Sequence, residues 1–282
     1  MNLHVIHTGN FKMDGGAMFG VVPKTIWERS YPADEKNLTS WAMRCLLIED
    51  GDRLILIDTG IGNKQSEKFF GYYFLHGDQS LHSSLHQAGF SRDDITDVFL
   101  THLHFDHVGG ALEFANGSKQ TIKTTFPRAT YWSNEAHWQW AMNSNPREKA
   151  SFLKENLQPL ADSGQLEMVD LTAPSPFTQF DILTVNGHTE KQMIPLIKYR
   201  DKKIVFAADL LPSVGHIPLP YVMSFDVRPL LTMEEKKAFL KEALNNQYYI
   251  FFEHDPSYEV CTLQQTEKGI RMKNTFLLEE IK

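Results

Sequence analysis

The order of strand-like and helix-like segments predicts an α+β fold, in which two mixed β-sheets flanked by helices pack face to face as an αββα sandwich. Strand-like runs dominate both halves of the 282-residue chain, and helix-like segments follow each group of strands. No composition break marks a linker, and no internal repeat is visible. We therefore expect a single domain over residues 1–282.

In the first half, residues 41–58 are typical of a β-hairpin, because two apolar runs flank an Asp-Gly-Asp turn. Residues 80–90 have a helical pattern, and residues 97–101 (DVFLT) indicate a short buried strand. Residues 61–79, rich in Gly, Phe and Tyr, are expected to be irregular.

The middle of the chain is expected to carry an inserted helical region, at about 133–165. SNEAHWQWAM, from Ser133, has a capping residue and an acidic first turn, and residues 147–158 form a second helix-like segment. We expect this insertion to cover the active site.

The second half alternates strands with one long helix. TMEEKKAFLKEALN, at 232–245, predicts an amphipathic helix with Thr232 as its cap. Four prolines at 210–231 indicate a restrained loop. The expected strands lie at 180–185, 193–199, 204–208 and 248–253.

Composition limits the partners and the compartment. Lys plus Arg total 28 against 35 Asp plus Glu, a net charge of −7, which disfavours a nucleic-acid binder because phosphate binding relies on basic residues. No run approaches the ~20 apolar residues that span a bilayer, and the start lacks an apolar leader, so we expect no membrane association. Two cysteines make no disulfide framework, which favours the cytoplasm. The expected partner is a small-molecule substrate, and a homo-oligomer is compatible with the sequence.

Four metal-capable side chains follow the strand at 97–101, in a segment that we call the histidine loop (residues 102–107, HLHFDH). In an extended segment residues i and i+2 point to the same side, so His102 and His104 can share one ion. Asp106 and His107 follow where the chain must turn, and they can reach a second ion. The alternative, a solvated His-rich loop, does not explain this density after a buried strand.

Three further candidates end later strands. His188 follows the strand at 180–185, Asp209 follows that at 204–208, and His254 follows that at 248–253. Asp58 ends the hairpin in the same manner. Each alone is more typical of a turn or capping residue, but together they suggest a shared site.

In this order the residues resemble the metallo-β-lactamase-fold superfamily of metallohydrolases, over about residues 40–255. The resemblance implies the αββα fold and two divalent metal ions. It also implies that Asp58 is a buried carboxylate that orders the histidine loop. The implied ligands are His102, His104 and His188 on one ion, Asp106, His107 and His254 on the other, and Asp209 between them.

Departures from particular subfamilies narrow the resemblance. Asp209 stands where zinc β-lactamases carry cysteine, and His104 stands where flavodiiron oxidoreductases carry Glu. The basic arm of the tRNA-processing branch has no counterpart here. The spacing of the later ligands and the all-nitrogen-and-oxygen ligand set look most like the lactonase and organophosphate-hydrolase branch. Zinc is the expected metal, and manganese, iron and cobalt are also compatible with these ligands.

The resemblance implies hydrolysis of a small ester or lactone by a hydroxide bound between two metals. Metal binding lowers the pKa of water towards ~7, which supplies the nucleophile at neutral pH. Asp106 is placed to orient the hydroxide and to relay a proton. Tyr221 and His216 lie in the Pro-rich loop after Asp209, where either could stabilise an oxyanion, with a structural hydrogen bond as the alternative.

Other functions of the same fold stay open at this point. They are phosphotriester hydrolysis, thioester hydrolysis and the mononuclear-iron chemistry of sulfur dioxygenases. No basic anchor adjoins the ligands in the sequence, which disfavours thioesters that carry carboxylates. Aromatic and aliphatic residues at 61–79, 133–142 and 210–225 suggest an apolar pocket wall.

Several conspicuous residues are not assigned to the site. His82 and His86 are four residues apart on a helical segment but lack a HExxH glutamate, so a solvated or packed face is the expectation. Trp138, Trp140 and Met142 are equally compatible with a pocket wall and with ordinary packing.

Overall fold

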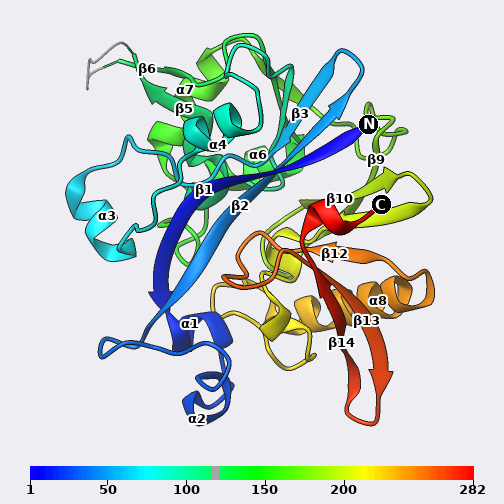
Figure 1. Cartoon of the computed structure of the whole chain (residues 1–282). Helices are drawn as coiled ribbons and strands as arrows, with labels where there is room; N and C mark the ends of the chain where they lie inside the picture. Colours follow the sequence, from blue (N-terminus) through cyan, green and yellow to red (C-terminus); the bar gives the residue numbers. More distant parts are fainter. Residues whose placement is uncertain (116–120) are drawn as a thin grey trace. The chain divides into compact units, whose positions relative to one another are not determined.

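The computed structural model describes residues 1–115 and 121–282 of the chain (Figure 1). Their contacts divide them into two compact units. Unit 1 comprises Met1–Gly9 and Met43–Pro176, and unit 2 comprises Asn10–Ala42 and Phe177–Lys282. The single domain expected over 1–282 stays a prediction.

The sheet of unit 1 has the strand order β1-β2-β3-β4-β7-β8 and is mixed, because β2 pairs antiparallel with β3, whereas β3, β4, β7 and β8 pair in parallel. Strands β1 and β2 extend beyond the boundary of this unit. Its strands are β1 (Asn2–Asp14), β2 (Leu38–Asp50), β3 (Arg53–Ile57), β4 (Asp97–Phe99), β7 (Thr130–Ser133) and β8 (Leu166–Met168), and a separate pair is formed by β5 (Leu112–Phe114) and β6 (Ile122–Thr124).

The predicted hairpin at 41–58 is confirmed. Asp50 pairs with Arg53, so Gly51 and Asp52 form the two-residue turn between β2 and β3. Gly51 has a positive φ of 60°, a conformation that glycine adopts without steric cost.

The helices of unit 1 pack with its sheet through a continuous apolar core. Trp138 and Leu157, from the region expected as an insertion, are buried members of this core. A role of that region in covering the active site stays a prediction. The helices are α3 (Glu67–Tyr73), α4 (Leu81–Gln87), α5 (Phe105–Val108), α6 (Glu135–Met142) and α7 (Lys154–Asp162), with a 3₁₀ turn, η1, at Gly109–Ala111.

The sheet of unit 2 has the order β14-β13-β12-β11-β10-β9. It is also mixed, because β11 and β12 are parallel and the other pairs are antiparallel. Its strands are β9 (Phe180–Val185), β10 (Gln192–Tyr199), β11 (Lys202–Phe206), β12 (Tyr249–Phe251), β13 (Val260–Thr266) and β14 (Gly269–Phe276). Its helices are α1 (Gly15–Phe19), α2 (Lys24–Trp27) and α8 (Pro229–Asn245), with 3₁₀ turns η2 (Ala208–Leu210), η3 (Val214–His216) and η4 (Leu278–Glu280).

Three sequence predictions of local structure were wrong. Helix α8 begins at Pro229, whose fixed φ suits the first helical turn, so Thr232 lies inside the helix and is not its cap. The segment at 147–158 becomes helical at Lys154. Residues 61–79 contain helix α3, because the Ser66 side chain caps it by accepting a hydrogen bond from the Phe69 amide.

Both cysteines, Cys45 and Cys261, are free and buried, as expected. Burial raises the pKa of the Cys261 thiol, which makes the thiolate less accessible. Among the described residues, no helix combines the length and apolar composition needed to cross a bilayer.

A buried lysine of α8 fixes the loop that follows η3. The Lys236 ammonium is 1% exposed and donates hydrogen bonds to the carbonyls of His216, Pro218 and Tyr221, at 3.0, 3.1 and 2.8 Å. Three acceptors satisfy the three donors of an ammonium group. This contact holds the Pro-rich loop in one conformation.

We expect Lys236→Met to destabilise the protein by about 2 kcal/mol or more, because it leaves three buried carbonyls without their donor. Lys237→Met is the matched control, since Lys237 is the exposed neighbour on the same helix. Urea unfolding of both variants measures the difference. Equal stability of the two variants would contradict the structural role of Lys236.

Candidate metal centre

The histidine loop leaves the end of β4 and enters α5. His102 and His107 are fully buried, His104 is 5% exposed, and Asp106 is partly exposed. The His102 ring lies 4.6 Å from that of His104 and 3.9 Å from that of His107, measured between centroids. Within unit 1 the loop therefore gathers three imidazoles.

Asp58 connects the hairpin to this loop inside unit 1. Its carboxylate accepts hydrogen bonds from the Thr101 amide and hydroxyl, at 2.8 and 2.6 Å. It also lies 3.0 Å from Nδ1 of His107, which directs Nε2 of that ring away from the carboxylate. Asp58 and His107 are both fully buried, so these contacts are shielded from water.

The other two imidazoles of the loop have partners of their own. The Thr101 hydroxyl lies 3.0 Å from Nδ1 of His102. A carboxylate oxygen of Glu148 lies 3.4 Å from Nε2 of His104. Buried His137 accepts a hydrogen bond from the Leu103 amide at 2.9 Å, which holds the loop backbone between them.

Gly109 and Gly110, which follow the histidine loop, are required by close packing and not by an unusual backbone conformation. A Cβ at Gly109 would lie 2.1 Å from the carbonyl oxygen of Ile61, and one at Gly110 would lie 2.2 Å from that of Thr59. Gly109 has an ordinary helical φ of −59°. Lack of space for a Cβ, rather than backbone freedom, therefore requires glycine at these two positions.

In unit 2, the Asp209 carboxylate lies between two imidazoles. Its Oδ2 is 3.1 Å from Nε2 of His188, and its Oδ1 is 3.2 Å from Nε2 of His254. All three side chains are at least nine-tenths buried. One carboxylate thus faces a different histidine with each oxygen, which is the arrangement that a bridging ligand requires.

Each of these histidines is also held through its other nitrogen. Nδ1 of His188 lies 2.8 Å from Asp226, and Nδ1 of His254 donates to the Ala42 carbonyl at 2.8 Å. Burial opposes charging of His188, but the Asp209 and Asp226 carboxylates outweigh it and raise its pKa to about 10. The two carboxylates therefore favour a positive charge here, either as a proton or as a cation.

The donor set fits divalent metal ions. Each imidazole has one nitrogen against a carboxylate, hydroxyl or carbonyl of its own unit, which fixes ring orientation as is usual for metal-binding histidines. The set contains nitrogen and oxygen donors and no thiolate, so it suits zinc and also manganese, iron or cobalt.

An aromatic cluster lies beside Asp106 in unit 1. The Phe105 ring lies 5.3 Å from that of Phe69 and 4.7 Å from that of Tyr73. Burial, together with the Asp106 carboxylate, raises the pKa of Tyr73 to about 12, so its phenol stays neutral. Residues 61–79 thus place aromatic side chains beside the histidine loop, and their role as a pocket wall stays a prediction.

The residues left open by the sequence have distinct places. His216 is buried, donates to the Met18 carbonyl at 2.8 Å and lies 2.7 Å from the Ser213 hydroxyl, which favours the structural alternative. Burial lowers its pKa to about 3. Tyr221 is partly exposed beside a cavity of unit 2, and its catalytic role stays a prediction.

The tryptophans, Met142 and His82, which the sequence analysis did not assign to the site, have packing or surface positions in unit 1. Trp138 is a core residue, and the Trp140 indole donates to Glu148 at 2.7 Å, whereas Met142 is 40% exposed. His82 lies 3.2 Å from Glu113 on the surface.

Sequence reasoning missed Asp226 and Glu148, which contact His188 and His104. Each is separated from its histidine by about forty residues and belongs to no recognisable motif. The sequence did contain one indication of Asp226, because it is a carboxylate in the restrained loop after Asp209.

Comparison with known proteins gives a consistent family. The model of the metallo-β-lactamase superfamily matches residues 43–254. A probable metal-dependent hydrolase from Staphylococcus aureus is 27% identical with a TM-score of 0.87, over 99% of this chain and 97% of that one. AidC, a dizinc quorum-quenching lactonase, is 23% identical with a TM-score of 0.79, over 98% and 95%.

An N-acyl homoserine lactonase from Bacillus thuringiensis is 32% identical over 110 residues, which are 36% of this chain and 43% of the lactonase. The chain therefore matches less than half of the length of this curated relative.

We expect Asp226→Asn to weaken metal binding by about 10–100-fold, because the carboxylate that orients His188 is lost while the ligand itself remains. Asp181→Asn removes an exposed carboxylate of the same unit and is the control. Competition with a chromogenic chelator measures both affinities. Unchanged affinity in Asp226→Asn would exclude this orienting role.

Proposed function

Because the chain belongs to the metallo-β-lactamase superfamily, we propose that it is a dinuclear metallohydrolase that cleaves a small carboxylic ester or lactone. The observation that carries the proposal is the Asp209 carboxylate, which faces His188 with one oxygen and His254 with the other. A buried carboxylate between two buried imidazoles needs a compensating positive charge, which divalent ions would supply.

The proposed ligand set takes residues from the histidine loop and from this group. Asp209 would hold both ions, and Asp58 orders the loop through Thr101 and His107. The proposed ligands are His102, His104 and His188 on one ion, and Asp106, His107 and His254 on the other. Zinc is the proposed metal, and AidC, which shares the fold, is described as dizinc.

When bound, two divalent ions would supply a hydroxide at neutral pH and polarise the carbonyl group of the substrate. Asp106 is partly exposed whereas the histidines around it are buried, so its carboxylate is the group of the loop placed to accept and return a proton. Asp58 and Asp226 would keep His107 and His188 in the tautomers that leave Nε2 directed at the metal.

An ester or lactone is favoured by the aromatic side chains beside Asp106. Phe69, Tyr73 and Phe105 form an aromatic cluster that would hold an acyl or aryl group by burial, at ~25 cal/mol per Å² of apolar area. The related Bacillus thuringiensis protein is an N-acyl homoserine lactonase. The substrate in that name combines a lactone with an acyl chain.

Metal content tests the site. We expect the purified chain to hold about two metal ions, and His104→Ala to lose metal and activity because a direct ligand is removed. His82→Ala, which alters a surface histidine, is the control. Elemental analysis gives the stoichiometry. One tightly bound iron with no second ion would support the dioxygenase alternative instead.

Substrate preference tests the reaction class. We expect kcat/KM to rise as the acyl chain of a lactone series lengthens from about four to about ten carbons, because longer chains bury more apolar area. If the Tyr221 hydroxyl holds the oxyanion, Tyr221→Phe should lower kcat by ~10²-fold with metal content unchanged. A flat series with strong phosphotriester turnover would transfer the proposal to phosphotriesters.

A further inference from the structure

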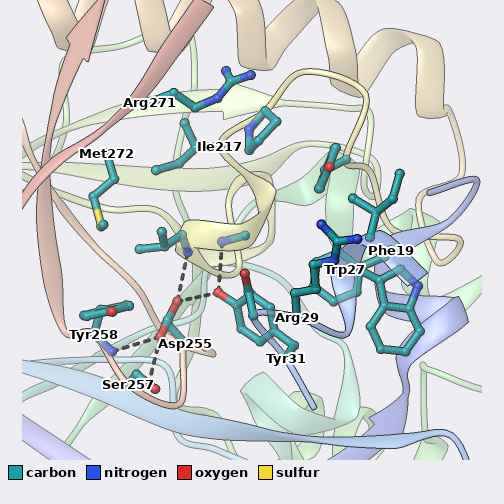
Figure 2. A pocket seen from close by; sticks show the side chains of 16 residues that line it. Phe19, Trp27, Arg29, Tyr31, Ile217, Asp255, Ser257, Tyr258, Arg271 and Met272 are labelled. Carbon is teal, nitrogen blue, oxygen red and sulfur yellow. Dashed lines mark hydrogen bonds between the residues drawn. The ribbon is translucent and has the colours of Figure 1, made fainter. Parts of the chain in front are cut away.

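A cavity of about 610 Å³ lies within unit 2, and its lining residues include none of the proposed metal ligands (Figure 2). Its size is in the range of cavities that bind small organic molecules. Four stretches of the chain form it: residues from the end of α1 to just after α2, the segment from η3 to Tyr221, residues 255–258 after β12, and residues 271–272 of β14.

Aromatic rings form much of the wall. Phe19 and Trp27 are buried and stacked, with 5.4 Å between ring centroids and an interplanar angle of 14°. Tyr31 and Tyr258 add two further rings. Such a wall binds a flat or apolar body by burial and by stacking.

Two guanidinium groups also line this cavity. Arg29 lies just after α2, and Arg271 lies on β14, so they belong to different walls (Figure 2). Neither forms an ion pair with any carboxylate in the described part of the chain, and Arg271 donates a hydrogen bond to the Ile270 carbonyl. Their charges therefore remain available to an anion.

The acidic residue of the lining has its own partners. Fully buried Asp255 accepts four hydrogen bonds at 2.9 Å, from the Tyr31 hydroxyl and from the amides of Val214, Ser257 and Tyr258. Four donors stabilise the charged carboxylate, so it requires no partner from a ligand. The positive charge that a ligand meets is that of the arginines.

The cavity is preformed. The Tyr31 hydroxyl also accepts from the Gly215 amide at 2.9 Å, so Asp255 and Tyr31 fix η3 (Figure 2). Lys236 holds the carbonyls of the following loop from the other side. A preformed wall lowers the conformational entropy that ligand binding costs.

We propose that this cavity binds a small organic carboxylate whose aromatic or short aliphatic body packs on Trp27 and its neighbours. The carboxylate pairs with Arg29, which lies beside Trp27 and Tyr31, and Arg271 adds positive charge from the other wall (Figure 2). This goes beyond the proposed hydrolase activity, because it assigns a ligand site that shares only Tyr221 with the residues proposed for hydrolysis. Arg29 and Arg271 are also basic groups that were not predicted from the sequence, since both are remote from the metal-ligand motifs.

The cavity and a proposed metal ligand share one segment of the chain. Asp255 directly follows His254, whose amide donates to the Pro212 carbonyl and whose carbonyl accepts from the Ala42 amide. The hydrogen bonds that hold Asp255 and η3 therefore also fix the chain next to His254.

Calorimetric titration of the metal-loaded full chain tests the proposal, with phenylacetate as the probe and neutral phenylacetamide as its isostere. We expect phenylacetate to bind about tenfold more tightly, because charge-assisted hydrogen bonds form in the carboxylate complex alone. Arg29→Gln should weaken phenylacetate binding several-fold or more and Arg271→Gln by a smaller factor, and both should leave phenylacetamide binding unchanged. Lys273→Gln, which removes one exposed charge from the same strand as Arg271, should leave both unchanged.

Three results would overturn the proposal. Equal affinity for phenylacetate and phenylacetamide would exclude recognition of the carboxylate, and this comparison needs no variant. Equal losses in Lys273→Gln and Arg29→Gln would assign the effect to net charge. Tight phenylacetate binding that survives both arginine substitutions would place the carboxylate elsewhere, such as on the metal ions.

Discussion

Buried imidazoles lie against buried carboxylates in both units, and the remaining geometry of each half of the candidate site depends on this pairing. Asp58 holds His107, and Asp226 and Asp209 hold His188 from opposite nitrogens. A carboxylate taken out of water needs donors or a positive charge. The surrounding backbone meets this requirement, because Thr101 donates two hydrogen bonds to Asp58. Gly109 and Gly110, which follow the histidine loop, pack directly against the carbonyls of Ile61 and Thr59.

The metallo-β-lactamase fold is confirmed, and the features that predicted it are local in sequence. The Asp-Gly turn fixed the hairpin register, and the histidine loop concentrates its donors in six residues after one buried strand. The early start of α8 at Pro229 escaped prediction because Thr232 satisfied the same capping rule. Strands β1, β13 and β14 were missed as well, since their alternation of buried and exposed residues is weak at the ends of the chain.

The residues that support the site were harder to predict than its ligands. Glu148 and Asp226 act on histidines about forty positions away, and no spacing rule connects them. The cavity of unit 2 combines residues near the start of the chain, such as Trp27, with Arg271 near its end. Such a surface arises from tertiary packing of segments that each look ordinary. Contiguous motifs therefore predicted the metal-binding residues, whereas the shape and charge of their surroundings could be described only from the three-dimensional structure.

The burial of both cysteines has a practical consequence. Cys45 and Cys261 are fully enclosed, and burial raises the pKa of the Cys261 thiol, so maleimide reagents should label the native chain very slowly. A cysteine introduced at Val21, which is 90% exposed and lies between α1 and α2, would then react selectively. A fluorophore attached there would report on occupancy of the neighbouring cavity without any change to the native thiols.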